Sequence, residues 1–242
     1  MRTKLETEPA DKAPHYSGKE LEAMSFARNY HKWILAEFLP YLGSSVAEVG
    51  AGVGSFSTLV LETNISSLVV FEPSQNMYPL LQEALGKDKR ATAVNEYFGA
   101  AHQETRFDSI LYVNVLEHIE DDASEIATAR DSLKPNGHLL IFVPALPWLY
   151  SEFDRHVGHC RRYLKKDLVN LIQRSGLAVV KARYFDVAGI IPWYINFVVL
   201  KNAMSAGSVS LYDRVVVPAM RLIEGLVPPP LGKNVLLVAR KD

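Results

Sequence analysis

The sequence has very little cysteine and no excess of charge of either sign. Of its 242 residues only Cys160 is a cysteine, so no disulfide can form within the chain. We therefore expect a protein of a reducing compartment, the cytoplasm. The 26 lysine and arginine residues are balanced by 27 aspartate and glutamate residues. Because nucleic-acid-binding proteins need a broad basic surface, we expect no nucleic-acid partner.

Long hydrophobic runs are also missing. The most apolar segment, residues 187–200, is interrupted by Gly189 and Pro192 and is shorter than the ~20 apolar residues that a membrane-spanning helix needs. Residues 1–18 are charged and polar, without the apolar segment of a signal peptide. We therefore expect no transmembrane span, a mobile tail over residues 1–18 and a single domain over residues 19–242.

Short apolar runs recur along the chain at the spacing of strands that are separated by helices. A helical period over residues 24–38 comes first. The runs that follow predict strands over residues 46–49, 68–71, 91–94, 109–113, 139–143, 178–184 and 234–239. Between the fourth and fifth of these, Asp122 is the expected N-cap of a helix. This alternation predicts an α/β fold with a doubly wound, mainly parallel sheet.

The connection before the last predicted strand is long and apolar. Residues 187–231 include Trp193, Tyr194 and Phe197, and a connection of this length normally carries helices of its own or a function. We expect a helical insertion. Its role stays open between a cap packed on the sheet, a homodimer contact and a lid over a hydrophobic acceptor. A membrane-surface role is less favoured, because few basic residues flank the segment.

The first predicted strand runs directly into three glycines at alternate positions. Gly50, Gly52 and Gly54 follow the strand, and Glu48 precedes them by two residues. Such a loop turns tightly and lets a ligand lie against bare backbone, because a Cβ atom would fill the space. The second predicted strand ends in Glu72, where a carboxylate can accept both hydroxyls of a ribose. Together these features predict an adenosine-containing cofactor.

The spacing of the glycines decides which cofactor to expect. A dinucleotide fingerprint would place its third glycine where this chain has Ser55, and a phosphate-binding P-loop would end in a lysine that is missing here. The pattern Glu-x-Gly-x-Gly-x-Gly resembles the first motif of class I S-adenosylmethionine-dependent methyltransferases. The resemblance covers about residues 29–241. It implies a Rossmann-like sheet of seven strands, mainly parallel with an antiparallel last strand, and S-adenosylmethionine as cofactor with S-adenosylhomocysteine as product.

Two further segments carry the resemblance: residues 72–77 resemble the family's acid-x-Ser-x-x-Met, and residues 114–119 resemble its Leu-Glu-His-Ile segment. The positions that it implies for the cofactor are Tyr30, Glu48, Gly50, Gly52, Gly54, Glu72, Pro73, Met77, Asn95, Glu96, Tyr97, Asn114 and Val115. Asn95, Glu96 and Tyr97 compete for the adenine amino group, and the sequence does not choose among them. Tyr30 and Met77 fit core packing as well as cofactor contact.

The loop after the fifth predicted strand, residues 144–163, is rich in Tyr, Asp, His and Arg. It resembles a Gly-His-x-Arg-Arg-Tyr signature associated with methyltransferases that occur beside glycosyltransferases. An oxygen acceptor loses a proton, so a base that titrates near neutrality is needed. The catalytic candidates are His118, His156, His159 and Asp154, the last as an orienting group or alternative base. The candidates for acceptor binding are Tyr150, Arg161, Arg162, Tyr163 and Trp193. Each has a structural alternative, such as loop anchoring or a solvated helix face.

A metal is not expected. Some metal-using methyltransferases carry Glu-x-x-Glu-His after the fourth strand, and here Asn114 replaces the first acid. The expected function is methyl transfer from S-adenosylmethionine to a small-molecule or lipid-linked acceptor, at oxygen, by in-line displacement. N- or C-methylation and a non-catalytic cofactor-binding partner subunit stay as alternatives. Ser55 disfavours a nucleotide-dependent oxidoreductase.

Overall fold

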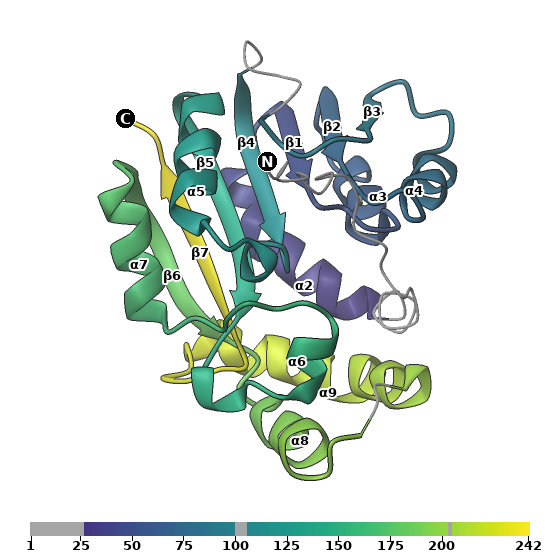
Figure 1. The fold of residues 1–242 in the computed structure, drawn as a ribbon, viewed down its shortest axis with the longest axis vertical. Helices are drawn as coiled ribbons and strands as arrows, with labels where there is room; N and C mark the ends of the chain where they lie inside the picture. The colour runs from purple at the N-terminus through teal and green to yellow at the C-terminus, as the bar shows by residue number, and fades with distance from the viewer. Residues whose placement is uncertain (1–26, 100–105, 203–204) are drawn as a thin grey trace, which may run out of the picture.

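The computed structural model describes residues 27–99, 106–202 and 205–242, and its centre is one seven-stranded sheet (Figure 1). The tail expected at residues 1–18 lies outside the described residues. The strands are β1 (Ser45–Val49), β2 (Ser67–Phe71), β3 (Ala91–Val94), β4 (Phe107–Val113), β5 (Leu133–Pro144), β6 (Ala178–Phe185) and β7 (Asn234–Arg240). Their order in the sheet is β3-β2-β1-β4-β5-β7-β6.

The predicted strand directions are confirmed. Strands β1 to β5 pair in parallel, and β7 is antiparallel to both of its neighbours, β5 and β6. Each predicted strand is present. The fifth begins at Leu133, earlier than predicted, because Leu133 already pairs with Phe107 ahead of a register shift between β4 and β5.

Helices cover both faces of the sheet (Figure 1). They are α2 (Arg28–Phe38), α3 (Ser55–Leu61), α4 (Tyr78–Leu85), α5 (Asp122–Ser132), α6 (Glu152–His156), α7 (Lys165–Arg174), α8 (Ile190–Trp193) and α9 (Ala206–Leu226). Short 3-10 turns are η1 (Leu39–Tyr41), η2 (Leu116–His118) and η3 (Pro147–Leu149), and η4 (Tyr194–Val199) is a π-helical turn.

One cap prediction is wrong. The N-cap of α5 is Asp121, whose carboxylate accepts a hydrogen bond from the Ser124 N–H at 3.0 Å. Asp122 is instead the first helical residue and binds Arg161 at 2.6 Å. Either aspartate suits the cap chemically, and the distant arginine decides between them.

The core consists of two hydrophobic clusters, one on each face of the sheet. Along β5 the side chains alternate: Leu139 and Ile141 belong to one cluster, and Leu140 and Phe142 belong to the other. This follows from the two-residue period of a strand that is covered on both sides. The sheet is therefore rigidly held, and its carboxyl-terminal edge can position a site.

The insertion predicted at residues 187–231 contains the helical segments α8, η4 and α9, and it ends in a non-helical segment over residues 227–231. These helices lie beyond the carboxyl ends of the parallel strands (Figure 1). Helix α9 is attached to α2, because the carboxylate of Asp213 accepts hydrogen bonds from the N–H groups of Asn29 and Tyr30 at 3.1 and 2.8 Å. Among the described helices, none has the length and apolar character to cross a bilayer.

Candidate active site

A cavity of about 1330 Å³ lies at the carboxyl-terminal edge of the sheet. Its walls come from the glycine loop after β1, the ends of β2 and β4, the loop after β5, and the inner side of the insertion. Ligands of open α/β sheets bind at this edge. The cavity is large enough for a nucleoside cofactor and an acceptor together.

The glycine loop is built for close approach. Gly50, Gly52 and Gly54 all have positive φ, at 66°, 57° and 81°, a conformation that strains other residues. A Cβ on Gly50 would lie 2.7 Å from Cγ2 of Val115. Gly50 and Gly52 line the cavity with Val115. Gly54 does not, because it is the N-cap of α3 and packs against Leu81.

Glu72 is fixed by the loop that it faces. Its Oε2 accepts a hydrogen bond from the Gly52 N–H at 2.7 Å, and its Oε1 accepts one from the Ser74 N–H at 2.8 Å. Burial raises the pKa of this carboxyl. Because a carboxylate has about four acceptor positions, Glu72 keeps capacity for a ribose hydroxyl.

Glu48 tests whether the cavity fits S-adenosylmethionine. Its side chain lines the cavity and is 2% exposed, and its Oε2 has no hydrogen-bond partner among the described residues. Burial raises the pKa of Glu48 to about 7. An unpartnered acceptor at the base of a glycine loop is complementary to an ammonium group, which the methionine part of this cofactor carries. The residues therefore fit the cofactor.

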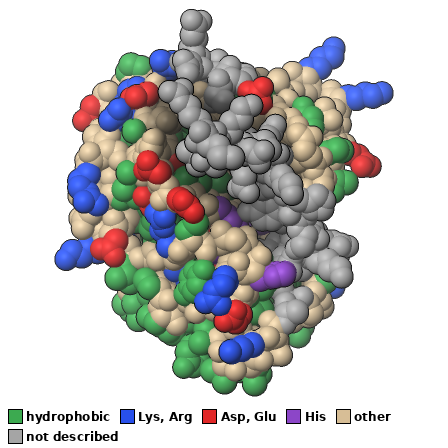
Figure 2. All heavy atoms as spheres, in the orientation of Figure 1, with side chains coloured by type: hydrophobic (Ala, Val, Ile, Leu, Met, Phe, Trp, Pro, Cys, Tyr) green, Lys and Arg blue, Asp and Glu red, His purple; other side chains and the backbone are tan. Residues whose placement is uncertain are grey.

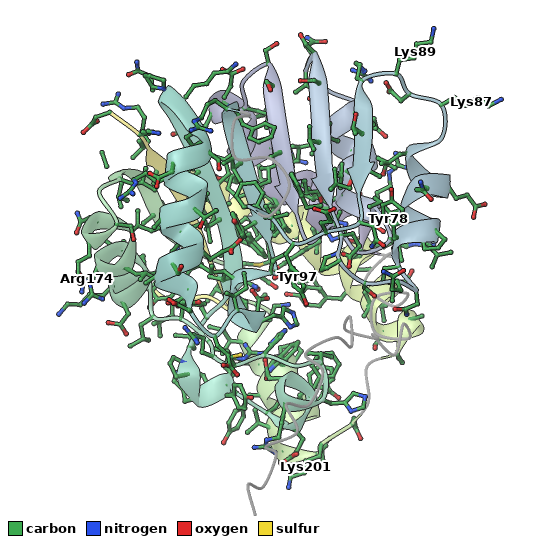
Figure 3. All side chains as sticks on the ribbon, turned by 45° about the horizontal axis from the view of Figure 1, so that its top comes forward. Tyr78, Lys87, Lys89, Tyr97, Arg174 and Lys201 are labelled. Atoms are coloured by element: carbon green, nitrogen blue, oxygen red, sulfur yellow. The ribbon has the colours of Figure 1, made fainter. Side chains whose placement is uncertain are left out.

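The remaining cofactor candidates divide into wall and support. Those on the cavity wall are Tyr30, Pro73, Met77, Glu96, Tyr97 and Asn114. Met77 is almost fully buried and Tyr97 is 62% exposed; Figure 3 shows Tyr97 at the edge of the sheet that faces the insertion. Asn95 does not line the cavity. Its side-chain amide donates to the backbone carbonyl of Glu72 at 2.8 Å and so holds the end of β2.

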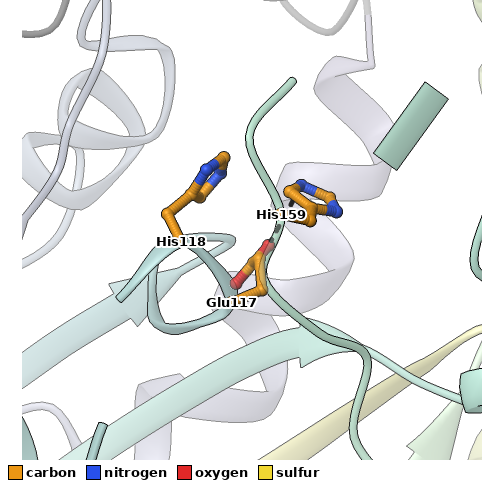
Figure 4. A group of neighbouring side chains, drawn as sticks. All are labelled: Glu117, His118 and His159. Atoms are coloured by element: carbon orange, nitrogen blue, oxygen red, sulfur yellow. Dashed lines mark ion pairs between the residues drawn. The ribbon is translucent and has the colours of Figure 1, made fainter. Parts of the chain in front are cut away.

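Glu117, His118 and His159 form a compact group on the cavity wall, here called the acid–imidazole cluster (Figure 4). The two rings meet edge to face with centroids 4.7 Å apart, and Nε2 of His159 lies 3.9 Å from Oε1 of Glu117. Glu117 is fully buried and neither carboxylate oxygen has a hydrogen-bond partner among the described residues. Burial raises the pKa of Glu117 to about 8, and burial together with His159 lowers the pKa of His118 to about 4.

Asp154 orients His159 from behind. The carboxylate is fully buried, and its Oδ1 lies 2.8 Å from Nδ1 of His159. It also accepts hydrogen bonds from the N–H and hydroxyl of Ser151 and from the guanidinium of Arg162. Burial alone would raise the pKa of Asp154, but these donors and the charge of Arg162 hold it below its usual value. Asp154 therefore stays ionised without reaching the cavity.

The acceptor candidates of the same loop are mostly anchors. Arg162 lines the cavity and its guanidinium lies 4.5 Å from the ring centroid of Trp193, which also lines it. Tyr150 donates to the backbone carbonyl of His159 at 2.7 Å. Arg161 and Tyr163 both donate hydrogen bonds to the carboxylate of Asp122, at 2.6 and 2.9 Å. None of these last three lines the cavity, whereas His156 does.

Lys233, immediately before β7, is a wall residue that sequence reasoning missed. It forms an ion pair with Asp186 at 3.1 Å and lies 5.2 Å from the ring centroid of Tyr30. The available signal was topological: the amino end of an antiparallel strand lies beside the carboxyl ends of its neighbours. The position of β7 in the sheet therefore brings Lys233 to the cavity.

Within the described residues, the acid–imidazole cluster is also a group that could hold a metal ion. One ligand atom from each member lies within 4.8 Å of the others. Two imidazoles and one carboxylate form a recognised donor set for divalent transition metals. We expect no metal because Asn114 replaces an acid in the sequence, and this expectation therefore stays a prediction.

Comparison with known proteins decides the family. Residues 13–182 match a family profile described as a methyltransferase domain. The chain belongs to this methyltransferase family. Its cofactor is S-adenosylmethionine, and it is a transferase. No curated protein matches the chain. The Gly-His-x-Arg-Arg-Tyr resemblance of the loop stays a prediction.

Solved structures share the fold of this methyltransferase. A methyltransferase from Mesorhizobium loti has a TM-score of 0.58 at 18% identity, over 86% of this chain and 95% of that one. The N-methyltransferase NodS from Bradyrhizobium japonicum, in complex with S-adenosylhomocysteine, has a TM-score of 0.61 at 16% identity, over 96% and 93%. A chain of the complex containing the Haloferax volcanii Trm112 methyltransferase activator has 0.65 at 14%, over 93% and 94%.

Proposed function

We propose that this methyltransferase transfers the methyl group of S-adenosylmethionine to an oxygen atom of a small-molecule or lipid-linked acceptor, with His159 as the base. The observation that carries the proposal is the bond between Nδ1 of His159 and the buried carboxylate of Asp154. This bond fixes the ring and leaves Nε2 for the acceptor, as in other His–Asp pairs. Asp154 would act as the orienting group.

The cofactor supplies a methyl group on a sulfonium, which is a good leaving group. The glycine loop would support its methionine part, with Glu48 facing the ammonium. Glu72 would accept the ribose hydroxyls, and Met77, Glu96 and Tyr97 would surround the adenine. The protein's main contribution is then alignment of the acceptor with the methyl group.

The surroundings of His118 and His159 favour His159 as the base. His118 has a pKa of about 4, so it is a weak base at neutral pH. His156 lies on the wall formed by α6. His159 takes the proton from the acceptor hydroxyl at Nε2, and the neighbouring negative charge of Asp154 stabilises the imidazolium that forms.

The insertion side of the cavity favours an acceptor with an apolar or aromatic part. Phe153, Trp193 and Phe197 form an aromatic group on this wall, with ring centroids between 4.4 and 5.5 Å apart. Such rings bind apolar surface and stack on other rings. In this proposal α8 and η4 act as the lid.

Transfer of tritium from methyl-labelled S-adenosylmethionine to phenols, carboxylic acids, amines and their lipid-linked forms tests the proposal. We expect labelled ethers or base-labile esters. His159→Gln should lower kcat by a factor of ~10² to 10⁴ and leave S-adenosylhomocysteine affinity unchanged. His138→Gln is the matched control, because His138 lies on β5 outside the cavity and contacts Tyr41. Full activity of His159→Gln would refute the assignment of the base.

The same assay separates the alternatives. Label found only in amines or only on carbon would assign N- or C-methylation. Cofactor binding without transfer to any acceptor would favour a non-catalytic partner subunit. The homodimer and the cytoplasmic location stay predictions from the sequence.

A further inference from the structure

The outer side of the helical insertion is strongly apolar. Of the eighteen large hydrophobic side chains exposed in the described part of the chain, twelve belong to residues 187–231. Figure 2 shows hydrophobic side chains gathered at the lower end of the molecule, where Figure 1 places α8. A concentration of this kind marks an interaction site.

Helix α9 shows how this surface is organised. Leu211, Val215, Leu222 and Leu226 are 67%, 62%, 69% and 78% exposed, and their spacings of four and seven residues place them on one side of the helix. Val217, on the opposite side, is buried in the core. We call the exposed side of α9 and of the adjoining α8 and η4 the outer face.

The charges of the insertion are sorted by sign. Its two acids point inward: Asp213 is 4% exposed and caps α2, and Glu224 is 1% exposed and binds Arg183. The exposed charges of the described insertion residues are Lys201, Arg214 and Arg221, all cationic. Arg214 and Arg221 are seven residues apart and so flank the apolar side of α9 together.

We infer that the outer face docks on a membrane surface that contains anionic phospholipid. Exposed apolar side chains bordered by cations are the pattern of an interfacial helix. Trp148 and Tyr194, 53% and 43% exposed with ring centroids 6.0 Å apart, add the amphipathic aromatics of a membrane interface. A symmetric dimer through this face is disfavoured, because it would bring the cations of the two copies close together. The described part of the insertion has no exposed acid that could pair with them, since Asp213 and Glu224 are buried.

Docking would bring the cavity to the bilayer. Trp193, Phe197 and Val217 line the cavity from α8, η4 and α9, whose outer sides form the docking face. A lipid-linked acceptor could then enter the cavity while its tail stays in the membrane. Only the entry of a lipid-linked acceptor rests on the proposed function, because vesicle binding is measured without cofactor or acceptor.

Sedimentation with lipid vesicles tests the inference on the full chain. We expect binding to vesicles of phosphatidylcholine with phosphatidylglycerol, and weaker binding to phosphatidylcholine alone or at high salt. Leu222→Glu with Leu226→Glu should lower the partition coefficient roughly a hundredfold. Arg214→Gln with Arg221→Gln should lower it about tenfold or more on anionic vesicles only.

Matched controls lie elsewhere on the surface. Leu80→Glu with Val180→Glu changes two side chains 47% and 46% exposed, and Lys87→Gln with Lys89→Gln removes two exposed cations (Figure 3). Both pairs should sediment like the unaltered protein, and all variants should keep the circular dichroism spectrum and S-adenosylhomocysteine affinity.

Failure of the unaltered protein to bind anionic vesicles, or equal binding by the Leu222 and Leu226 variant, would overturn the inference. A dimer in ultracentrifugation that this variant dissociates would overturn it in favour of a second copy. If the unaltered protein did not bind S-adenosylhomocysteine, the cofactor assignment would be refuted, and the vesicle measurement would still decide the membrane inference by itself.

Discussion

Glu117 should make the cofactor-free protein less stable as the pH rises. Its carboxyl is fully buried, and burial raises the pKa from 4.5 to about 8. Between these two values the folded protein holds a proton that the unfolded chain has released. The unfolded state therefore binds fewer protons, and the free energy of unfolding falls as the pH increases. The contribution of this proton to the free energy of unfolding is complete below pH 4.5 and lost above pH 8.

The size of the effect follows from the same two values. Each pKa unit corresponds to about 1.4 kcal/mol, so the loss is about 3 kcal/mol between pH 4.5 and 7 and at most about 5 kcal/mol above pH 8. Glu117→Gln keeps the shape and removes the proton equilibrium. Any cost of burying an amide is independent of pH, so it shifts the curve without changing its slope.

The measurement is urea unfolding of both proteins from pH 5 to pH 8 without cofactor. Other groups titrate too: Glu48 acts in the same direction, and His31 and His118, with pKa values of about 4, raise stability between pH 4 and 6.5. These contributions are common to both proteins, so the difference curve isolates Glu117. We expect the variant to gain stability relative to the unaltered protein as the pH rises. A flat difference curve would refute the reasoning.

Three further outcomes are expected. Glu72→Ala should raise the Kd for S-adenosylhomocysteine at least tenfold in calorimetry, since hydrogen bonds to a charged group contribute ~1.5–3 kcal/mol each; an unchanged Kd would move the ribose site elsewhere. Gly50→Ala should cost ~2 kcal/mol or more in urea unfolding, because its Cβ would overlap Val115 at a positive φ, whereas Gly207→Ala, with open space around it, should be neutral or stabilising. Methyl transfer should persist after treatment with a chelator; loss of activity that zinc or manganese restores would give the acid–imidazole cluster a metal role and remove His159 as base.

The sheet could be predicted from the sequence because its central strands, such as β1, β4 and β5, are covered on both faces. Such strands appear as short continuous apolar runs, and the glycine loop marks the first of them. The N-cap of α5 could not be predicted in the same way. Asp121 and Asp122 are chemically equivalent as caps, and the choice depends on Arg161, 39 residues away in the sequence.

The loop after β5 shows a different limit. Its composition marks it as functional, but composition does not say which way a side chain points. His159 and Arg162 reach the cavity, whereas Tyr150 and Tyr163 hold the loop to backbone and to α5. In the insertion, the sequence likewise does not show which charged side chains are exposed. Asp213 and Glu224 look like ordinary surface acids in the sequence, and only their tertiary partners show that the exposed charges of the insertion are cationic.

The buried carboxylates around the cavity differ in how their charge is satisfied. Asp154 receives hydrogen bonds from Ser151, His159 and Arg162, and its pKa is lowered. Glu48 and Glu117 are as deeply buried, yet each has unpartnered oxygen and a raised pKa. Folding alone does not favour an acid left this way. A ligand that brings a positive charge or a donor to Glu48 would supply what the chain itself does not, and this is the physical reason why we propose that the cofactor's ammonium binds there.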